Sequence, residues 1–98
     1  MNLQKPKRET DKNYRKYIEQ QPCLVRNSDC LGDVVCHHTV TVGAGGSDYL
    51  GVPLCAEHHT GKTGVHQMGR DSFQKFHNID FRDEIIRLLK EYIREITP

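Results

Sequence analysis

Thiol and imidazole side chains are the residues of this sequence with the clearest chemistry. A chain of 98 residues holds four cysteines and six histidines. All of them except His77 fall in four short segments, at 23–30, 36–38, 55–59 and His66. A tetrahedral zinc ion takes four thiolate or imidazole ligands, commonly from two pairs that are close in sequence. This concentration of ligands in a small chain predicts at least one structural metal site.

A zinc site of the Cys3His type is the first prediction. Its ligands would be Cys23, Cys30, Cys55 and His58. Cys55 and His58 are closely spaced, so a turn can bring both side chains to one ion. Cys23 and Cys30 are wider apart, but the turn-forming residues 27–29 can close the gap between them. Cys36 competes with His58 for the fourth position. The alternative is a set of buried thiols without metal, since a free cysteine packs as a small hydrophobic residue.

Two adjacent histidines, His37 and His38, lie within a β-branched stretch. Valine and threonine dominate residues 34–42, which predicts a strand. Successive side chains of a strand point to opposite faces. One histidine could therefore bind a metal ion while the other faces a substrate. The alternative is an ordinary pair of strand histidines, one packed and one exposed.

The segments around these residues supply the elements that would position them. A short amphipathic helix is expected over 11–20, capped by Asp11 or Thr10, with Tyr14, Tyr17 and Ile18 on its apolar side. A glycine-rich loop at 43–47 would join the first strand to a second at 49–54. Pro53 would have to sit at the edge or the end of that second strand.

Helices are expected in the rest of the chain. One would begin at Cys55 and run to about Thr60, where Gly61 and Gly64 interrupt it, and another would span 71–77. Asp80 would cap a final helix, in which the apolar residues at helical spacing are Ile85, Ile86, Leu88, Leu89, Tyr92, Ile93 and Ile96. These C-terminal helices, 71–96, most simply cover the core, and the last could also form the seam of a homodimer.

Composition bounds the class of protein. The length indicates one domain over 1–98, comprising a flexible basic arm at 1–10, a core at 22–66 and the C-terminal helices. Hydrophobic residues make up 36% of the chain and tryptophan is absent, so the core is small. A structural metal ion is one way in which such a small domain gains stability. No apolar run is long enough to cross a membrane. No secretory signal is evident, so we expect a cytoplasmic protein with reduced thiols.

The net charge of +1 excludes a strongly basic nucleic-acid tail, but charge is unevenly distributed. The first 22 residues hold six cations against three acids, the cations being Lys5, Lys7, Arg8, Lys12, Arg15 and Lys16. Such a local excess suits phosphate contacts, which set affinity without reading sequence. A solvated arm is the alternative.

Taken together, the motifs resemble the ββα-metal core of HNH endonucleases, and most nearly small prophage-encoded HNH nucleases linked to recombination. The residues that carry the likeness are Pro22-Cys23-Leu24-Val25-Arg26 through Cys30, His37-His38, Gly43 to Asp48, Val52-Pro53-Leu54-Cys55 and His58-His59. The resemblance covers roughly residues 22–76. It implies an α+β fold, a zinc-stapled ββα-metal (HNH, His-Me finger) core with an N-terminal helix and C-terminal helices.

The resemblance also implies roles for the histidines. His37 would ligate a catalytic divalent ion, His38 would be the general base, and His59 would be the second ligand of the ion, which leaves His58 to the structural zinc. His66 is a further candidate ligand. On one continuous helix it would stand about 10.5 Å along the axis from His59, too far to share an ion, unless Gly61 and Gly64 let the chain fold back.

One family residue is missing, because no asparagine lies between Cys36 and His59 to brace the loop between the strands. Asp48 is the expected substitute. The implied activity is hydrolysis of DNA phosphodiester bonds in phage or prophage DNA processing or recombination. The ion would be Mg²⁺ or Mn²⁺, with Ni²⁺, Co²⁺ and Zn²⁺ as softer alternatives. The competing hypothesis is a non-catalytic zinc module that binds DNA or a phage replication protein.

Overall fold

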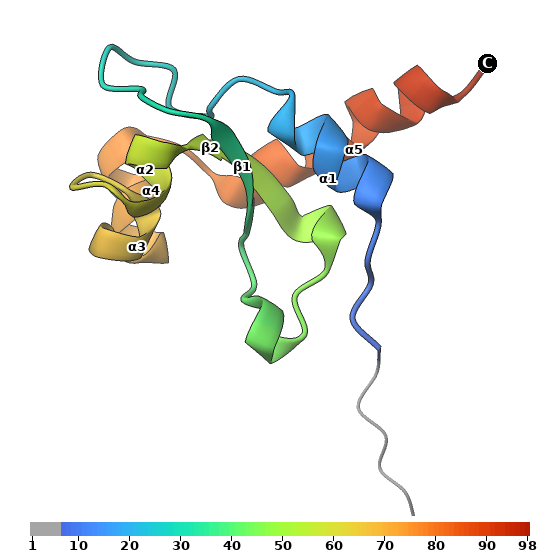
Figure 1. Ribbon diagram of the computed structural model, residues 1–98, viewed down its shortest axis with the longest axis horizontal. Helices are drawn as coiled ribbons and strands as arrows, with labels where there is room; N and C mark the ends of the chain where they lie inside the picture. The colour runs from blue at the N-terminus through green and yellow to red at the C-terminus, as the bar shows by residue number, and fades with distance from the viewer. Residues whose placement is uncertain (1–6) are drawn as a thin grey trace, which may run out of the picture.

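A computed structural model describes residues 7–98 of the chain, which form a small α+β fold (Figure 1). Its helices and strands, in chain order, are α1 (Lys12–Glu19), β1 (Val34–His38), β2 (Gly51–Cys55), α2 (Ala56–Thr60), α3 (Val65–Met68), α4 (Arg70–His77) and α5 (Phe81–Ile96). Two short 3₁₀ turns, η1 (Val42–Ala44) and η2 (Asp48–Leu50), lie between the strands. Within this part of the chain, no helix combines the length and the apolar character that a membrane crossing needs.

The sheet is a single antiparallel hairpin of β1 and β2. Its register pairs Val34 with Cys55 at one end and His38 with Gly51 at the other. β2 is buried along its whole length, whereas β1 is half-buried. Pro53 lies inside β2, as an edge position allows, because a two-stranded sheet has only edge strands.

Both strands differ in extent from the sequence prediction. The first strand ends at His38 rather than at residue 42, because β2 offers no partner before Gly51 and the chain turns into η1. The β-branched run therefore continues into a loop, where Val40 and Val42 are exposed. The second strand begins only after η2 and extends through Cys55.

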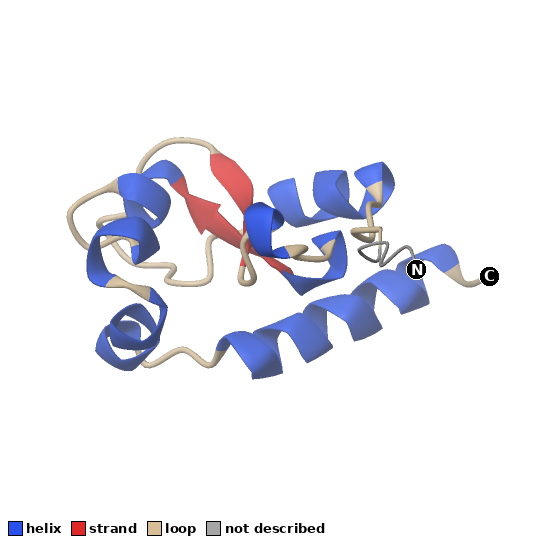
Figure 2. Cartoon of the chain, turned by 90° about the horizontal axis from the view of Figure 1, so that it is seen from below, coloured by secondary structure: helices blue, strands red, loops and turns tan. Residues whose placement is uncertain are grey.

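Two groups of helices flank the hairpin (Figures 1 and 2). In both views α2, α3 and α4 gather on one side, while α1 and α5 lie on the other. The predicted caps are confirmed: Asp11 accepts a hydrogen bond from the Tyr14 N–H at 2.9 Å, and Asp80 accepts one from the Asp83 N–H at 3.2 Å. α1 and α5 meet through aromatic rings, since the Tyr92 ring centroid lies 4.9 Å from that of Tyr14.

The hydrophobic core fills the space between the hairpin and α1, α4 and α5. Its buried residues are Tyr14, Tyr17, Ile18, Cys23, Val52, Leu54, Cys55, Val65, Phe73, Phe81 and Leu88. The apolar residues of α5 do not all face this core. Three of them are exposed, namely Ile86, Ile93 and Ile96. The spacing therefore predicted the helix correctly, but the apolar face that the helix buries is narrower than predicted.

The N-terminal arm is fastened where the structure describes it, contrary to the predicted flexibility through Thr10. The Arg8 guanidinium donates to the Gly46 carbonyl at 3.3 Å, and the Glu9 carbonyl accepts from the Asp48 N–H at 3.0 Å. The remainder of the predicted arm, residues 1–6, lies outside the described residues.

Candidate metal centres

The structure brings the four predicted zinc ligands together. Cys55 ends β2, His58 lies in α2, and Cys23 and Cys30 come from the loop between α1 and β1. One candidate ligand atom from each residue lies within 4.8 Å of the others. His58 Nδ1 is 3.2, 3.6 and 3.7 Å from the Sγ atoms of Cys55, Cys30 and Cys23 respectively. A tetrahedral zinc ion with ordinary bond lengths would hold such atoms about 3.6 Å apart, so the donor set fits zinc.

Burial opposes an uncompensated thiolate at both Cys23 and Cys55. Burial raises the pKa of Cys23 to about 11, because a thiolate there would lose its hydration. Burial acts in the same direction at Cys55, but hydrogen bonds from the His58 and Leu31 backbone, together with those from the Cys23 and Cys30 side chains, outweigh it and lower the pKa of that thiol. A divalent ion deprotonates coordinating thiols and supplies the opposing charge. The group can therefore hold a structural metal such as zinc.

Cys36, the competing fourth ligand, lies elsewhere. Its side chain covers Gly51 so closely that a β-carbon there would collide with the sulfur. Burial raises the pKa of the Cys36 thiol to about 12, which keeps it protonated. His58, and not Cys36, therefore completes the cluster with the other three cysteines.

His77 supports this cluster from α4, a position that the sequence left without a role. Its ring centroid is 5.2 Å from that of His58, and the two rings meet edge to face. His77 Nε2 lies 2.9 Å from the carbonyl oxygen of Thr63, so the ring donates to the turn between α2 and α3. His77 thus connects the Cys3His group to this turn, which leads into the helix that carries His66.

The second cluster consists of His37 from β1, His59 from α2 and His66 from α3. One ring nitrogen of each lies within 4.8 Å of the others. His59 Nε2 and His66 Nε2 are 3.0 Å apart. The rings of His37 and His59 have centroids 5.3 Å apart. His66, which one continuous helix would place too far from His59, is therefore brought back to the other two rings.

Two glycines make this return possible. α2 ends at Thr60, and the Gly61 N–H donates to the Glu57 carbonyl at 2.8 Å. A β-carbon at Gly61 would collide with Glu57, and one at Gly64 would come within 2.9 Å of the Glu57 carbonyl oxygen. The tight turn leads into α3, a short helix that was not predicted from the sequence. α3 begins one residue before His66.

The surroundings of the three-histidine cluster disfavour protonation of two of its rings, His37 and His59. Burial lowers the pKa of His37 to about 4, and the neighbouring His59 and His66 add to the effect. Burial and His66 also lower the pKa of His59. Imidazole must be neutral to ligate a metal ion, and His37 is neutral at physiological pH. An ion held by these three nitrogens would keep a coordination position open beside the exposed His66.

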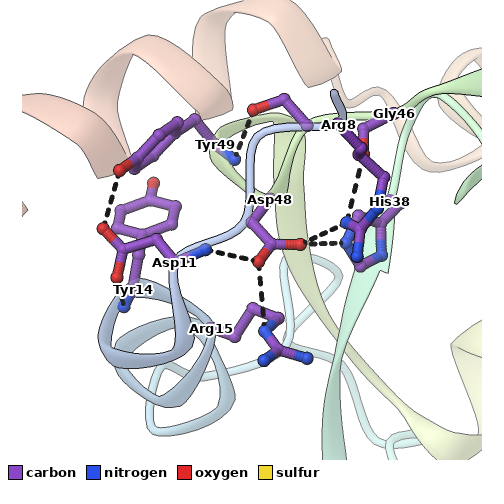
Figure 3. A network of polar contacts seen from close by, with 9 residues as sticks. Arg8, Asp11, Tyr14, Arg15, His38, Gly46, Asp48 and Tyr49 are labelled. Carbon is purple, nitrogen blue, oxygen red and sulfur yellow. Dashed lines mark hydrogen bonds and ion pairs between the residues drawn. The ribbon is translucent and has the colours of Figure 1, made fainter. Parts of the chain in front are cut away.

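His38 points away from this cluster and toward a buried carboxylate (Figure 3). Its Nε2 lies 2.7 Å from Asp48 Oδ1. The same carboxylate accepts from Arg8 Nη1 at 2.8 Å and from the Asp11 N–H at 2.7 Å, and it pairs with Arg15 Nε at 3.1 Å. Asp48 thus links the loop between the strands to β1 and to the N-terminal segment.

The charge state of Asp48 sets the tautomer of His38. Burial raises the pKa of this carboxyl, but hydrogen bonds from His38, the Asp11 amide and Arg8 outweigh burial and lower the pKa to about 2. A carboxylate only accepts hydrogen bonds, so His38 Nε2 must carry the hydrogen. In the neutral ring the lone pair is then on Nδ1. The sequence reading expected Asp48 to brace the loop, but it missed the partnership with Arg8 and Arg15, which are separated from Asp48 by more than thirty residues.

Comparison of the chain with protein-family models, with curated proteins and with solved structures gives no match. The resemblance to HNH endonucleases therefore stays a hypothesis about motifs. The geometry of the two clusters and of the His38–Asp48 pair is the basis for the functional inference.

A first prediction concerns the Cys3His group. We expect the purified protein to hold one zinc ion per chain and Cys55→Ser to lose it. Zinc contributes about 10–16 kcal/mol of apparent binding energy in small zinc-dependent domains, which is comparable with or larger than the net stability of most domains, about 5–15 kcal/mol. The variant should therefore be largely unfolded by circular dichroism. Cys36→Ser is the matched control and should keep one zinc ion. A folded, zinc-free Cys55→Ser protein would contradict the prediction.

A second prediction concerns the three-histidine cluster. Zinc-loaded protein should bind one further ion of Mn²⁺, Co²⁺ or Ni²⁺ in a calorimetric titration. His66→Ala should weaken that binding by at least about tenfold, since even the loss of a hydrogen-bond partner of a metal ligand costs about 10- to 100-fold. Gln67→Ala, at the next exposed position of α3, serves as the control and should bind normally. Equal affinity in His66→Ala and the wild type would remove His66 from the ligand set.

Proposed function

We propose that the chain is a metal-dependent endonuclease that hydrolyses DNA phosphodiester bonds on an HNH-like ββα-metal core, in phage or prophage DNA processing or recombination. One observation carries the proposal. A histidine held by a buried carboxylate, His38, directly follows a histidine of a three-histidine cluster, His37, in the strand that precedes β2 and α2. These two neighbouring residues would supply the base and one metal ligand of the proposed centre.

The three-histidine cluster would hold the catalytic ion through His37 and His59, with His66 as the third ligand. A divalent ion bound there would neutralise the phosphate and stabilise the leaving 3′ oxygen. Mg²⁺ prefers oxygen ligands, whereas three imidazoles form a softer site. Mn²⁺, Co²⁺, Ni²⁺ and Zn²⁺ therefore suit this donor set at least as well as Mg²⁺ does.

His38 would act as the general base at Nδ1. Histidine is the side chain that most often serves as a general base in enzymes. Asp48 fixes the ring by its contact with Nε2, and its negative charge would stabilise the imidazolium that forms when Nδ1 takes the proton of the attacking water. Asp48 is therefore a positioning residue, since it acts through His38 and not on the substrate.

The Cys3His group would be structural in this proposal. It ties the segment before β1 to the junction of β2 and α2, and His58 and His59 are neighbours in α2. A metal at the first cluster would therefore hold in place the helix that supplies a ligand to the second. The competing zinc module uses the same cysteines, but it would bind one metal ion and leave DNA intact.

The central test is cleavage by a variant without the base. We expect wild-type protein with Mg²⁺ or Mn²⁺ to nick or cut at least one DNA form among supercoiled, linear and branched substrates. His38→Ala should lower kcat by about 10²- to 10⁴-fold, the usual contribution of general base catalysis, with an unchanged circular dichroism spectrum. Val40→Ala, two residues along the chain, should retain activity. Intact DNA with the wild type under all metals would reject the nuclease and favour the zinc module.

The role of Asp48 gives a separate prediction. Asp48→Asn removes the negative charge and lets the amide donate to His38, which would favour the wrong tautomer. We expect kcat to fall by about 10²- to 10⁴-fold, as for carboxylates that orient a histidine base in other enzymes, while KM changes little. Arg8→Gln removes another partner of the same carboxylate and should preserve kcat far better. Similar kcat values for Asp48→Asn and wild type would show that Asp48 braces the loop only.

A further inference from the structure

A cationic pocket lies between α1 and β1, beside His38. It has a volume of about 330 Å³ and is lined from α1 by Lys12, Arg15, Lys16 and Glu19 and from β1 by Val35, Cys36 and His38. Cys36 and His38 are two residues apart in the strand, so their side chains leave the same face. His37, which belongs to the three-histidine cluster, leaves the opposite face.

The charges around this pocket are unbalanced. Three cations face one acid, Glu19. Arg15 already pairs with Asp48 at 3.1 Å. Lys12 and Lys16 are exposed, and neither forms an ion pair with any residue in the described range 7–98. The two lysines therefore have their charges available for a ligand.

The arrangement of these lysines serves the helix only in part, because Lys16 lies in the last turn of α1, where the helix dipole favours a cation. Lys12 and Lys16 stand four residues apart on α1, where like charges repel each other. Lys12 also lies in the first turn, where the helix dipole disfavours a cation, and that turn has no acidic residue. The repulsion between the two lysines and the position of Lys12 oppose helix stability, and this local cost points to a binding role.

We infer that this pocket binds a backbone phosphate of the DNA substrate, next to the phosphate that is cut. The inference rests on the proposed function for the identity of its ligand. His38 lines the pocket and is also the proposed base, so the two phosphates would lie on either side of one residue. Because the three-histidine cluster lies across β1 from the pocket, one phosphate could not occupy both. Lysines act as point charges, so the interaction would set affinity and register without reading base sequence.

The test is the salt dependence of DNA binding. Zinc-loaded protein without further divalent ions is titrated with a fluorescent duplex oligonucleotide over a range of NaCl concentrations. For duplex DNA, the slope of log K against log salt changes by about 0.9 for each phosphate that the protein neutralises. The double variant Lys12→Gln/Lys16→Gln should bind more weakly, with a slope smaller by about 0.9 for each phosphate that it no longer neutralises. Lys75→Gln/Lys90→Gln, with the same charge change on exposed sites of α4 and α5, should keep the wild-type slope.

Two further measurements separate binding from folding. The midpoint of thermal unfolding of Lys12→Gln/Lys16→Gln should equal or exceed that of the wild type, because the change removes a repulsive pair. Lys12→Arg/Lys16→Arg keeps the charge and should restore the slope. An unchanged slope in the glutamine variant, or an equal decrease in the Lys75/Lys90 control, would contradict phosphate binding by this pocket.

Cleavage assays on the same proteins distinguish this inference from the proposed function. A wild type that cuts DNA, together with an unchanged slope in the glutamine variant, would reject the pocket and leave the nuclease standing. Lysine-dependent binding without cleavage would support the pocket and reject the nuclease. A wild type that neither binds nor cuts DNA would reject both.

Discussion

The carboxylate of Asp48 carries a negative charge at a position that solvent does not reach. A buried charge is costly unless it is paired and hydrogen-bonded. Here the cost is offset by three hydrogen bonds, from His38, Arg8 and the Asp11 amide, and by the ion pair with Arg15. Since these donors come from β1, the N-terminal segment and α1, one carboxylate fixes three parts of the chain around the loop between the strands.

The Cys3His group holds the other end of the same hairpin. Asp48 acts near the pair of His38 and Gly51, whereas the cysteines and His58 gather near the pair of Val34 and Cys55. An isolated two-stranded hairpin is marginally stable in water. With both ends fastened, and with α1 and α5 packed against it, this hairpin can present histidines from β1 in fixed positions without a large sheet behind it.

Local patterns predicted the elements well, because capping residues and helical spacing act over a few positions. Asp11 and Asp80 cap α1 and α5 as expected, and the spacing of Cys55 and His58 indicated a shared site. The remaining features depend on contacts that local patterns do not contain. The return of His66 depends on how closely Gly61 and Gly64 approach Glu57. The end of β1 depends on where its partner strand begins, and the network of Asp48 joins residues far apart in sequence.

His37 and His38 show how a strand can give adjacent residues different chemistry. The alternation of strand side chains directs His37 toward two other imidazoles and His38 toward a carboxylate. Burial and neighbouring rings lower the pKa of His37 to about 4, which disfavours a proton and leaves its lone pair for a metal ion. The anion beside His38 acts differently, because it fixes the hydrogen on Nε2 and leaves Nδ1 as the acceptor. The period of one strand thus creates two different environments for two adjacent imidazoles.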